Sequence, residues 1–396
     1  MSAKVQLTTP TAPGGRMRWP DVAKGLSILG VVLLHVSLAV PEGMETFAAE
    51  VNRILDPLRM PLFFMVSGFF SAKVLGYSFR DLFLRRLWFF LVPYLVWVPV
   101  ELWFKFREWH MFNDQPMPGV SRYLSHIVEG RNMYWFLYAL VIFNIFLWAT
   151  RKLPWWAGLL VGFAPILILP LHADQHMVGK AVLYLPAFLL GAHLRHHIRD
   201  FSAGATGLRN LTRGTLLYAA GFTLAAVWAW GNTVAEVSLP WPLPGAETAG
   251  FADLRLIVNA VVQLLMLPMA VIVAVLLGRV PVVSDVLCFL GRHTLVIYLG
   301  HPIALTVLYH YNMRGLELPV TRGADHVLNE TALWILIGLA ISAVGSFALW
   351  LVTRIPYVRW TVMPPLLRAT AGSAATGAST RGTMTAAPTT AKATTR

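Results

Sequence analysis

The sequence predicts an all-α fold, a polytopic bundle of about ten transmembrane helices. Of its 396 residues, 57% are hydrophobic and only 13% are charged, whereas soluble domains carry about 25% charged residues. Apolar runs of the length that crosses a bilayer as a helix, about 20 residues, recur along most of the chain. Because backbone groups in lipid must bond within their own segment, we expect these runs to be helical.

The apolar runs divide the chain into spans, connections and two polar ends. We expect spans at residues 21–40, 54–74, 86–104, 133–150, 155–171, 180–194, 213–231, 254–277, 285–309 and 331–353. They form a membrane domain at residues 20–355, between a cytoplasmic segment at residues 1–19 and a disordered, Thr/Ala-rich cytoplasmic tail at residues 369–396. Lys and Arg gather in alternate connections, whereas the first outer loop holds Glu42 and Glu45. The positive-inside rule therefore puts both termini in the cytoplasm of a multi-pass inner-membrane protein.

Charge and cysteine content exclude several classes of function. The net charge is +13, but the basic residues lie in short connections and tails, so we expect no nucleic-acid partner. The single cysteine, Cys288, allows neither a disulfide framework nor a Cys-based metal site. His193 and His197 are four residues apart with only a poorly phased Asp200 nearby, so we expect no metal site.

The first span, DVAKGLSILGVVLLHVSLAV, contains three ionisable residues, Asp21, Lys24 and His35. Lys24 and His35 are eleven residues apart, which places them on one helix face about 16 Å apart along the axis. Asp21 lies one turn before Lys24 and can pair with it. Ionisable residues are costly in a membrane, so their presence indicates a functional role. The alternative is that Asp21 and Lys24 are interfacial anchors and His35 is a packed core histidine.

Polar residues of the second and third spans are further candidates. Arg59 lies near the expected outer surface and Ser67 in the inner half, although Arg59 can also simply extend to the interface. Arg85 and Arg86 lie at the cytoplasmic start of the third span. Arginine side chains match phosphate oxygens in pairs, so these two, with Lys24, can hold phosphates; anchoring at the inner surface is the alternative.

The ninth span carries a polar stripe, in which Thr294, Tyr298 and His301 follow at i, i+4 and i+7. Counted from the inner surface, His301 and His35 lie at similar depth, and Arg59 lies close to that level. Two histidines and an arginine at one depth favour a shared polar cavity.

The longest outer connection, residues 105–132, contains mixed charges that include Glu129 and Arg131. We expect it to form the rim of an acceptor site. Trp135 follows and offers a ring on which a sugar can stack; an interfacial aromatic belt is the alternative.

Four stretches together resemble the acyltransferase-3 family of integral membrane O-acyltransferases. They are DVAKGLSILGVVLLH, MPLFFMVSGFF, RRLWFFLVPY and LGRHTLVIYLGH, in that order. Within the family, the chain most resembles the fucose 4-O-acetylase-like branch.

The resemblance implies transfer of an acyl group, acetyl by default, from cytoplasmic acyl-CoA to a hydroxyl of a cell-envelope glycan or glycolipid on the outer side. Acyl-CoA is then a co-substrate, and no cofactor stays bound. His35 matches the histidine needed for transfer, as general base or as acylated intermediate, and Lys24 matches the basic residue that ten others separate from it. His301 or Arg59 is expected to steady the developing oxyanion. Many members carry two arginines three apart before the third span, but here Trp88 follows Arg85 at that spacing.

Two other classes of function remain open on the sequence. Intramembrane Asp, Lys, Arg and His also mark transporters and flippases, although no inverted repeat is visible. A structural membrane protein without catalysis is the third possibility.

Overall fold

The chain folds into a bundle of helices in this computed structural model, which describes residues 17–54, 56–234, 238–241, 247–312, 330–365 and 367. Its α-helices and strands are α1 (Trp19–Ala39), α2 (Phe47–Ile54), α3 (Asp56–Ser71), α4 (Phe79–Leu82), α5 (Trp88–Phe112), α6 (Val120–Val128), α7 (Trp135–Ala149), α8 (Trp155–Val161), α9 (His176–His193), α10 (Arg195–Ala203), α11 (Leu208–Val234), β1 (Ser238–Pro240), β2 (Thr248–Gly250), α12 (Phe251–Leu277), α13 (Pro281–Arg292), α14 (Thr294–Ala304) and α16 (Thr331–Val352). Short 3₁₀ or π turns join them: η1 (Gly43–Glu45), η2 (Ala72–Gly76), η3 (Phe83–Leu87), η4 (Thr150–Lys152), η5 (Ala164–His172), η6 (Leu305–His310) and η8 (Val358–Thr361). The predicted all-α class is confirmed, and in the described chain the only sheet is the antiparallel pair β1–β2.

Six of the described helical segments are long and apolar enough to cross a membrane, or eight if each of two bent pairs counts as one span. The bends are 78° between α9 and α10 and 77° between α13 and α14. Two further predicted spans correspond to α3 and α7, which have 16 and 15 residues and are short for a full crossing. The protein is thus a helical membrane protein, while the count of ten and the cytoplasmic termini stay predictions. The predicted tail at 369–396, and residues 1–16 of the predicted amino-terminal segment, lie outside the described residues.

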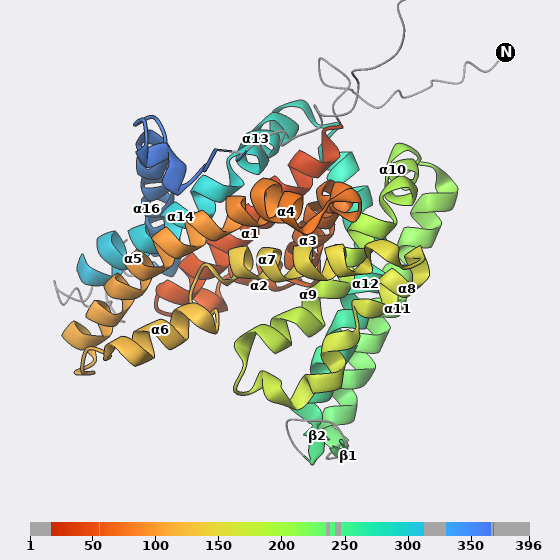
Figure 1. Cartoon of the computed structure of the whole chain (residues 1–396), viewed down its shortest axis with the longest axis horizontal. Coiled ribbons are helices and arrows are strands. Elements are labelled where there is room, and N and C mark those ends of the chain that lie inside the picture. Colours follow the sequence, from red (N-terminus) through yellow and green to blue (C-terminus); the bar gives the residue numbers. More distant parts are fainter. Residues whose placement is uncertain are drawn as a thin grey trace, which may run out of the picture.

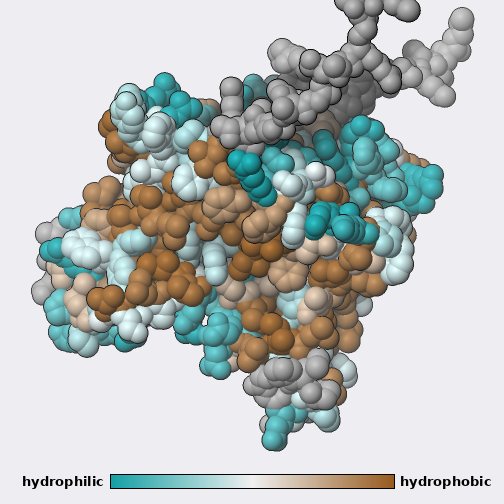
Figure 2. Space-filling model, viewed as in Figure 1, coloured by the Kyte–Doolittle hydropathy of each residue, from teal (hydrophilic) through white to brown (hydrophobic). Residues whose placement is uncertain are grey.

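The long helices α11 and α12 pack side by side and meet at the β1–β2 hairpin. Figure 1 shows this hairpin at one end of the bundle and α10, α13 and the start of α1 at the other; we call the latter the N-terminal end of the bundle. In Figure 2, hydrophobic surface covers much of the middle, and hydrophilic residues gather toward the ends. This distribution fits a bundle embedded in lipid at mid-height.

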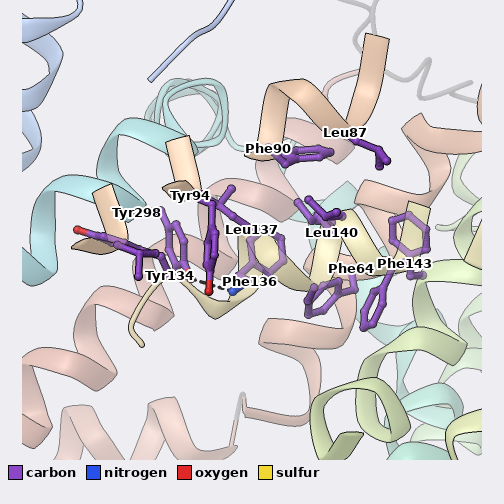
Figure 3. Packing of buried hydrophobic residues seen from close by; sticks show 14 of the residues in the cluster. Phe64, Leu87, Phe90, Tyr94, Tyr134, Phe136, Leu137, Leu140, Phe143 and Tyr298 are labelled. Carbon is purple, nitrogen blue, oxygen red and sulfur yellow. Dashed lines mark hydrogen bonds between the residues drawn. The ribbon is translucent and has the colours of Figure 1, made fainter. Parts of the chain in front are cut away.

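An aromatic core fills the space between α3, α5, α7, α9 and α14. Phe64 lies 5.1 Å from Phe143 between ring centroids, and Phe143 lies 5.7 Å from Phe188. Figure 3 shows Phe64 and Phe143 together, with Tyr94, Tyr134 and Tyr298 at the other side of the cluster. These large buried rings fix the positions of the helices that carry the polar site.

Two glycines allow α1 and α13 to touch backbone to backbone. A Cβ atom added at Gly25 would lie 2.0 Å from the Leu287 carbonyl oxygen, and one at Gly291 would lie 1.9 Å from the Asp21 carbonyl oxygen. Only a residue without a side chain fits at such separations. Pro20 at the first turn of α1 suits the start of this helix.

The connection predicted at residues 105–132 is largely helical. Helix α5 continues to Phe112, and α6 lies within the same stretch. The Tyr123 hydroxyl of α6 donates a hydrogen bond to the Pro99 carbonyl of α5. Burial raises the pKa of the Tyr123 phenol, with a smaller contribution from Glu101, so it remains a donor at neutral pH.

Candidate active site

A cavity of about 690 Å³ opens among α1, α3, α5, α7, α13 and α14 near the N-terminal end of the bundle. Its size is typical of sites for small molecules and cofactors. The polar lining residues are Lys24, Ser27, Ser67, Arg86, Arg292, Thr294, Tyr298 and Arg359. Along α1 the lining runs from Lys24 to Val31, two helical turns or about 10 Å.

The described lining of this cavity has four basic side chains and no acidic one: Lys24, Arg86, Arg292 and Arg359. Asp21 lies behind Lys24 and pairs with it, with 3.0 Å between the ammonium nitrogen and a carboxylate oxygen. An unbalanced set of positive charges attracts a polyanion, and guanidinium groups suit phosphates.

The structure separates the two adjacent arginines that the sequence analysis grouped. Arg86 lines the cavity, where its guanidinium donates to the Ser71 hydroxyl at 2.5 Å and to the Asn144 side-chain oxygen at 3.3 Å. Arg85 does not line the cavity; it pairs with Asp81 at 3.0 Å and is about half exposed. Arg86 is thus held in place by neutral partners, and its charge remains available for a ligand.

Two of the basic lining residues were missing from the predicted site. Arg292 ends α13 and donates to the Cys288 carbonyl at 3.1 Å, and Arg359 lies in η8, beyond the last long helix. In the sequence, Arg292 lay near the inner end of the predicted ninth span, and Arg359 looked like an ordinary basic residue of the inner segment after the last span. The sequence does show single arginines beside several different spans, which could have indicated a shared site. Only the fold shows that these arginines line one cavity.

His35 and His301 form a hydrogen-bonded pair, with 2.8 Å between His35 Nδ1 and His301 Nε2. The ring planes differ by 15° and the centroids are 5.1 Å apart. Because this separation exceeds the nitrogen–nitrogen distance by about two ring radii, the rings meet edge to edge through these atoms. His301 is fully buried.

The backbone determines which nitrogen carries each proton in this pair. His301 Nδ1 lies 2.7 Å from the Ile297 carbonyl oxygen, which can only accept, so Nδ1 is the donor. The Nε2 atom of neutral His301 is therefore an acceptor, and His35 Nδ1 donates to it. This leaves a lone pair on His35 Nε2, the form required of a base or a nucleophile.

The histidine pair lies just beyond the cavity. His35 follows Val31 by one turn of α1, about 6 Å, and neither histidine belongs to the cavity lining. Lys24 and His35 thus lie along one helix, the first within the cavity and the second past its end.

Tyr298 stands between the cavity and the histidines. It lines the cavity and donates to the Met133 carbonyl at 2.7 Å. It also accepts from the Phe136 amide at 3.2 Å (Figure 3). Glu101 of α5 is also buried, at 4% exposed. It was absent from the predicted site, although a carboxylate within an apolar span was a sufficient signal.

Arg59 is buried on another side of α1. Its guanidinium donates to the Asn52 side chain at 3.0 Å and to the Gly30 carbonyl at 3.4 Å. It is near enough to His35 to act on it electrostatically, as is Lys105. These bonds hold α3 against α1 and α2, and a direct role of Arg59 at the reacting atoms stays a prediction.

The three predicted rim residues lie outside the cavity, near the start of α7. Glu129 pairs with Arg131 at 2.6 Å, and Arg131 also donates to the Asp174 carbonyl. Trp135 packs against Tyr184, with ring centroids 5.8 Å apart, and Lys180 lies over its ring. The Trp135 ring is therefore engaged by protein neighbours, and an acceptor there would have to share or displace them.

The described residues contain no group of three or more His, Cys, Asp or Glu side chains that could hold a metal ion. His193 instead contacts the Thr150 hydroxyl, 3.0 Å away.

These features define a helical membrane protein with a cationic cavity that ends beside a buried histidine pair, an arrangement suited to group transfer. A family model described as an acyltransferase domain matches residues 17–351, so the chain belongs to the acyltransferase-3 family. The prediction of a membrane acyltransferase is confirmed at this level. No curated protein and no solved structure matches the chain.

Proposed function

We propose that this protein moves an acyl group, acetyl by default, from cytoplasmic acyl-CoA to a hydroxyl of a cell-envelope glycan or glycolipid at the outer side of the inner membrane. The observation that carries the proposal is the cationic cavity that stops one helical turn from the His35–His301 pair. We also propose a place in the fucose 4-O-acetylase-like branch, the part of the family that the chain most resembles.

The donor occupies the cavity in this proposal. Coenzyme A is long and polyanionic, with a thin, nearly neutral thioester end. Its phosphates bind Lys24 and Arg86, together with Arg292 and Arg359, and its arm extends past Ser27 toward Tyr298. The distance of about 16 Å from Lys24 to His35 is of the order that this arm has to bridge.

His35 then activates the acceptor. The hydroxyl oxygen attacks the thioester carbon, its proton passes to His35 Nε2, and the carbon–sulfur bond breaks. The proton finally moves to the coenzyme A sulfur, which gives the ester and the free thiol without any net proton change. If His35 Nε2 instead takes the acyl group, the kinetics become ping-pong, which separates the two routes.

The acceptor approaches from the opposite side to the donor. Glu129, Arg131 and Trp135 are the proposed rim, supported by their position at the start of α7, whose Phe136 forms part of the cavity wall. Their charges and rings suit a polyhydroxylated acceptor.

A radiolabelled acetyl-CoA assay tests the proposal in detergent-solubilised protein with envelope extract as acceptor. We expect label in the extract with the wild type, loss of about 10²- to 10⁴-fold in His35→Ala, and little change in the control His293→Gln. Full transfer by folded His35→Ala refutes the role of His35. If the label stays on coenzyme A with every variant, the chain acts as a transporter or flippase. Comparing envelope material from a deletion strain and its parent identifies the acceptor through a difference of about 42 Da per acetyl group.

A further inference from the structure

A second cavity lies at the N-terminal end of the bundle, between the start of α1, helix α10 and the end of α12. Its volume is about 290 Å³, and its lining includes Arg18, Trp19, Arg199, Asp200 and Arg279. It shares no described lining residue with the donor cavity, so the proposed acyl transfer does not use it.

One arginine of this lining, Arg279, is fixed at the cavity by a neutral partner. A terminal nitrogen of Arg279 donates to the Thr206 hydroxyl at 3.0 Å, which holds this guanidinium in place. Trp19, which is 6% exposed, belongs to the same lining. The positive charge of Arg279 is therefore held at the cavity without being neutralised by Thr206.

The charge of the lining is positive. Arg18 pairs with Asp285, and Arg199 lies 3.4 Å from an oxygen of Asp200. Arg279 has no carboxylate partner within the described part of the chain. We therefore expect a ligand of this cavity to be an anion.

We propose that this second cavity binds the phosphate group of an anionic phospholipid. Helix α1 begins and α12 ends here, and α10 turns by 78° from α9, so the cavity lies where the long helices end. Headgroup phosphates lie at this level of a membrane, where Trp and Arg side chains are favoured. The bound lipid would hold α1, which carries Lys24 and His35, against α10 and α12.

Thermal unfolding of the purified full-length protein in neutral detergent tests the proposal without any acyl-transfer assay. The ligands are dioctanoyl phosphatidylglycerol, dioctanoyl phosphatidylcholine and inorganic phosphate. We expect only phosphatidylglycerol to raise the melting temperature saturably. Arg279→Gln should raise the half-saturating concentration of phosphatidylglycerol about tenfold. This corresponds to about 1.4 kcal/mol, the order of one hydrogen bond to a charged group.

Two variants make the result specific. Arg199→Gln changes a second, more exposed arginine of the lining and should also weaken the lipid effect; it decides the matter if Arg279→Gln fails to fold. Arg213→Gln removes an exposed charge near the start of α11, outside the cavity, and should leave the lipid effect unchanged. Equal shifts with both lipids, or equal effects of the Arg279 and Arg213 variants, overturn the site. A shift produced by inorganic phosphate alone overturns the lipid assignment in favour of free phosphate.

Discussion

Replacing His301 with phenylalanine removes the hydrogen-bond acceptor of His35 while a ring remains at a fully buried position. Without that acceptor, nothing fixes the proton on His35 Nδ1, and the lone pair no longer has to lie on Nε2. We therefore expect His301→Phe to lower kcat. The KM for acyl-CoA should change little, because His301 does not line the donor cavity.

The size of the effect follows from the contact itself. When His35 takes the hydroxyl proton, its 2.8 Å bond to His301 becomes a hydrogen bond from a charged donor. Such bonds contribute about 1.5–3 kcal/mol, which corresponds to a decrease in kcat of about 10- to 150-fold. This is smaller than the loss expected for His35→Ala, because the base itself remains.

Single-turnover release of coenzyme A thiol, with envelope extract as acceptor, measures this decrease. His301→Gln is the informative companion, since its amide oxygen can accept from His35 and should restore part of the rate. The melting temperature of each variant shows whether it folds. A folded His301→Phe protein with wild-type kcat would falsify the proposed role of the histidine pair.

Three further predictions concern the donor cavity and its walls. Arg86→Gln should raise the KM for acyl-CoA about tenfold through loss of a charge-assisted bond, whereas Arg85→Gln, exposed and outside the cavity, should leave it unchanged. Gly291→Ala places a Cβ atom 1.9 Å from the Asp21 carbonyl oxygen and should lower the free energy of unfolding by at least about 1–3 kcal/mol, measured by thermal or SDS denaturation. Tyr298→Phe removes the bonds of its hydroxyl to the Met133 carbonyl at 2.7 Å and the Phe136 amide at 3.2 Å and should cost about 1–3 kcal/mol in the same measurement.

Each of these predictions has a result that contradicts it. Equal KM changes in the Arg86 and Arg85 variants would mean that general surface charge, rather than the cavity, attracts the donor. A Gly291→Ala protein with an unchanged melting temperature would mean that α1 and α13 separate easily. If Tyr298→Phe is as stable as the wild type, the tyrosine bond contributes no net stability.

The sequence predicted the helical class and most helix positions, because membrane-spanning length leaves a clear apolar signal. It predicted the second and fourth spans as residues 54–74 and 133–150, whereas α3 and α7 have only 16 and 15 residues. Helix α3 packs closely against α9, and α7 contacts both α5 and α9. Helices covered by protein on several sides do not need the full thickness of the lipid, and sequence length alone does not reveal this.

Side-chain direction was harder to predict than helix position. Arg85 and Arg86 lie in a π-helical turn, Phe83–Leu87, where one extra residue per turn changes which side chain faces inward. Helical periodicity could not distinguish them. By contrast, counting residues from the membrane surface was enough to place His35 and His301 at similar depth, and the structure brings them into contact.

The residues missed by the sequence analysis share one property. Arg292, Arg359 and Glu101 lie on different elements, and each becomes part of the site only through packing between them. Glu101 also lies near the end of the predicted third span, residues 86–104, whereas α5 continues as a helix to Phe112. A prediction made span by span has no means of joining such residues.

The backbone contact between α1 and α13 bears on how the enzyme can evolve. These two helices form one wall of the donor cavity, and their seam at Gly25 and Gly291 leaves no room for a larger residue. Elsewhere the lining includes large side chains that smaller ones can replace, among them Phe89 and Trp360. Laboratory selection for activity with bulkier acyl donors should therefore yield substitutions at such large side chains and leave Gly25 and Gly291 unchanged.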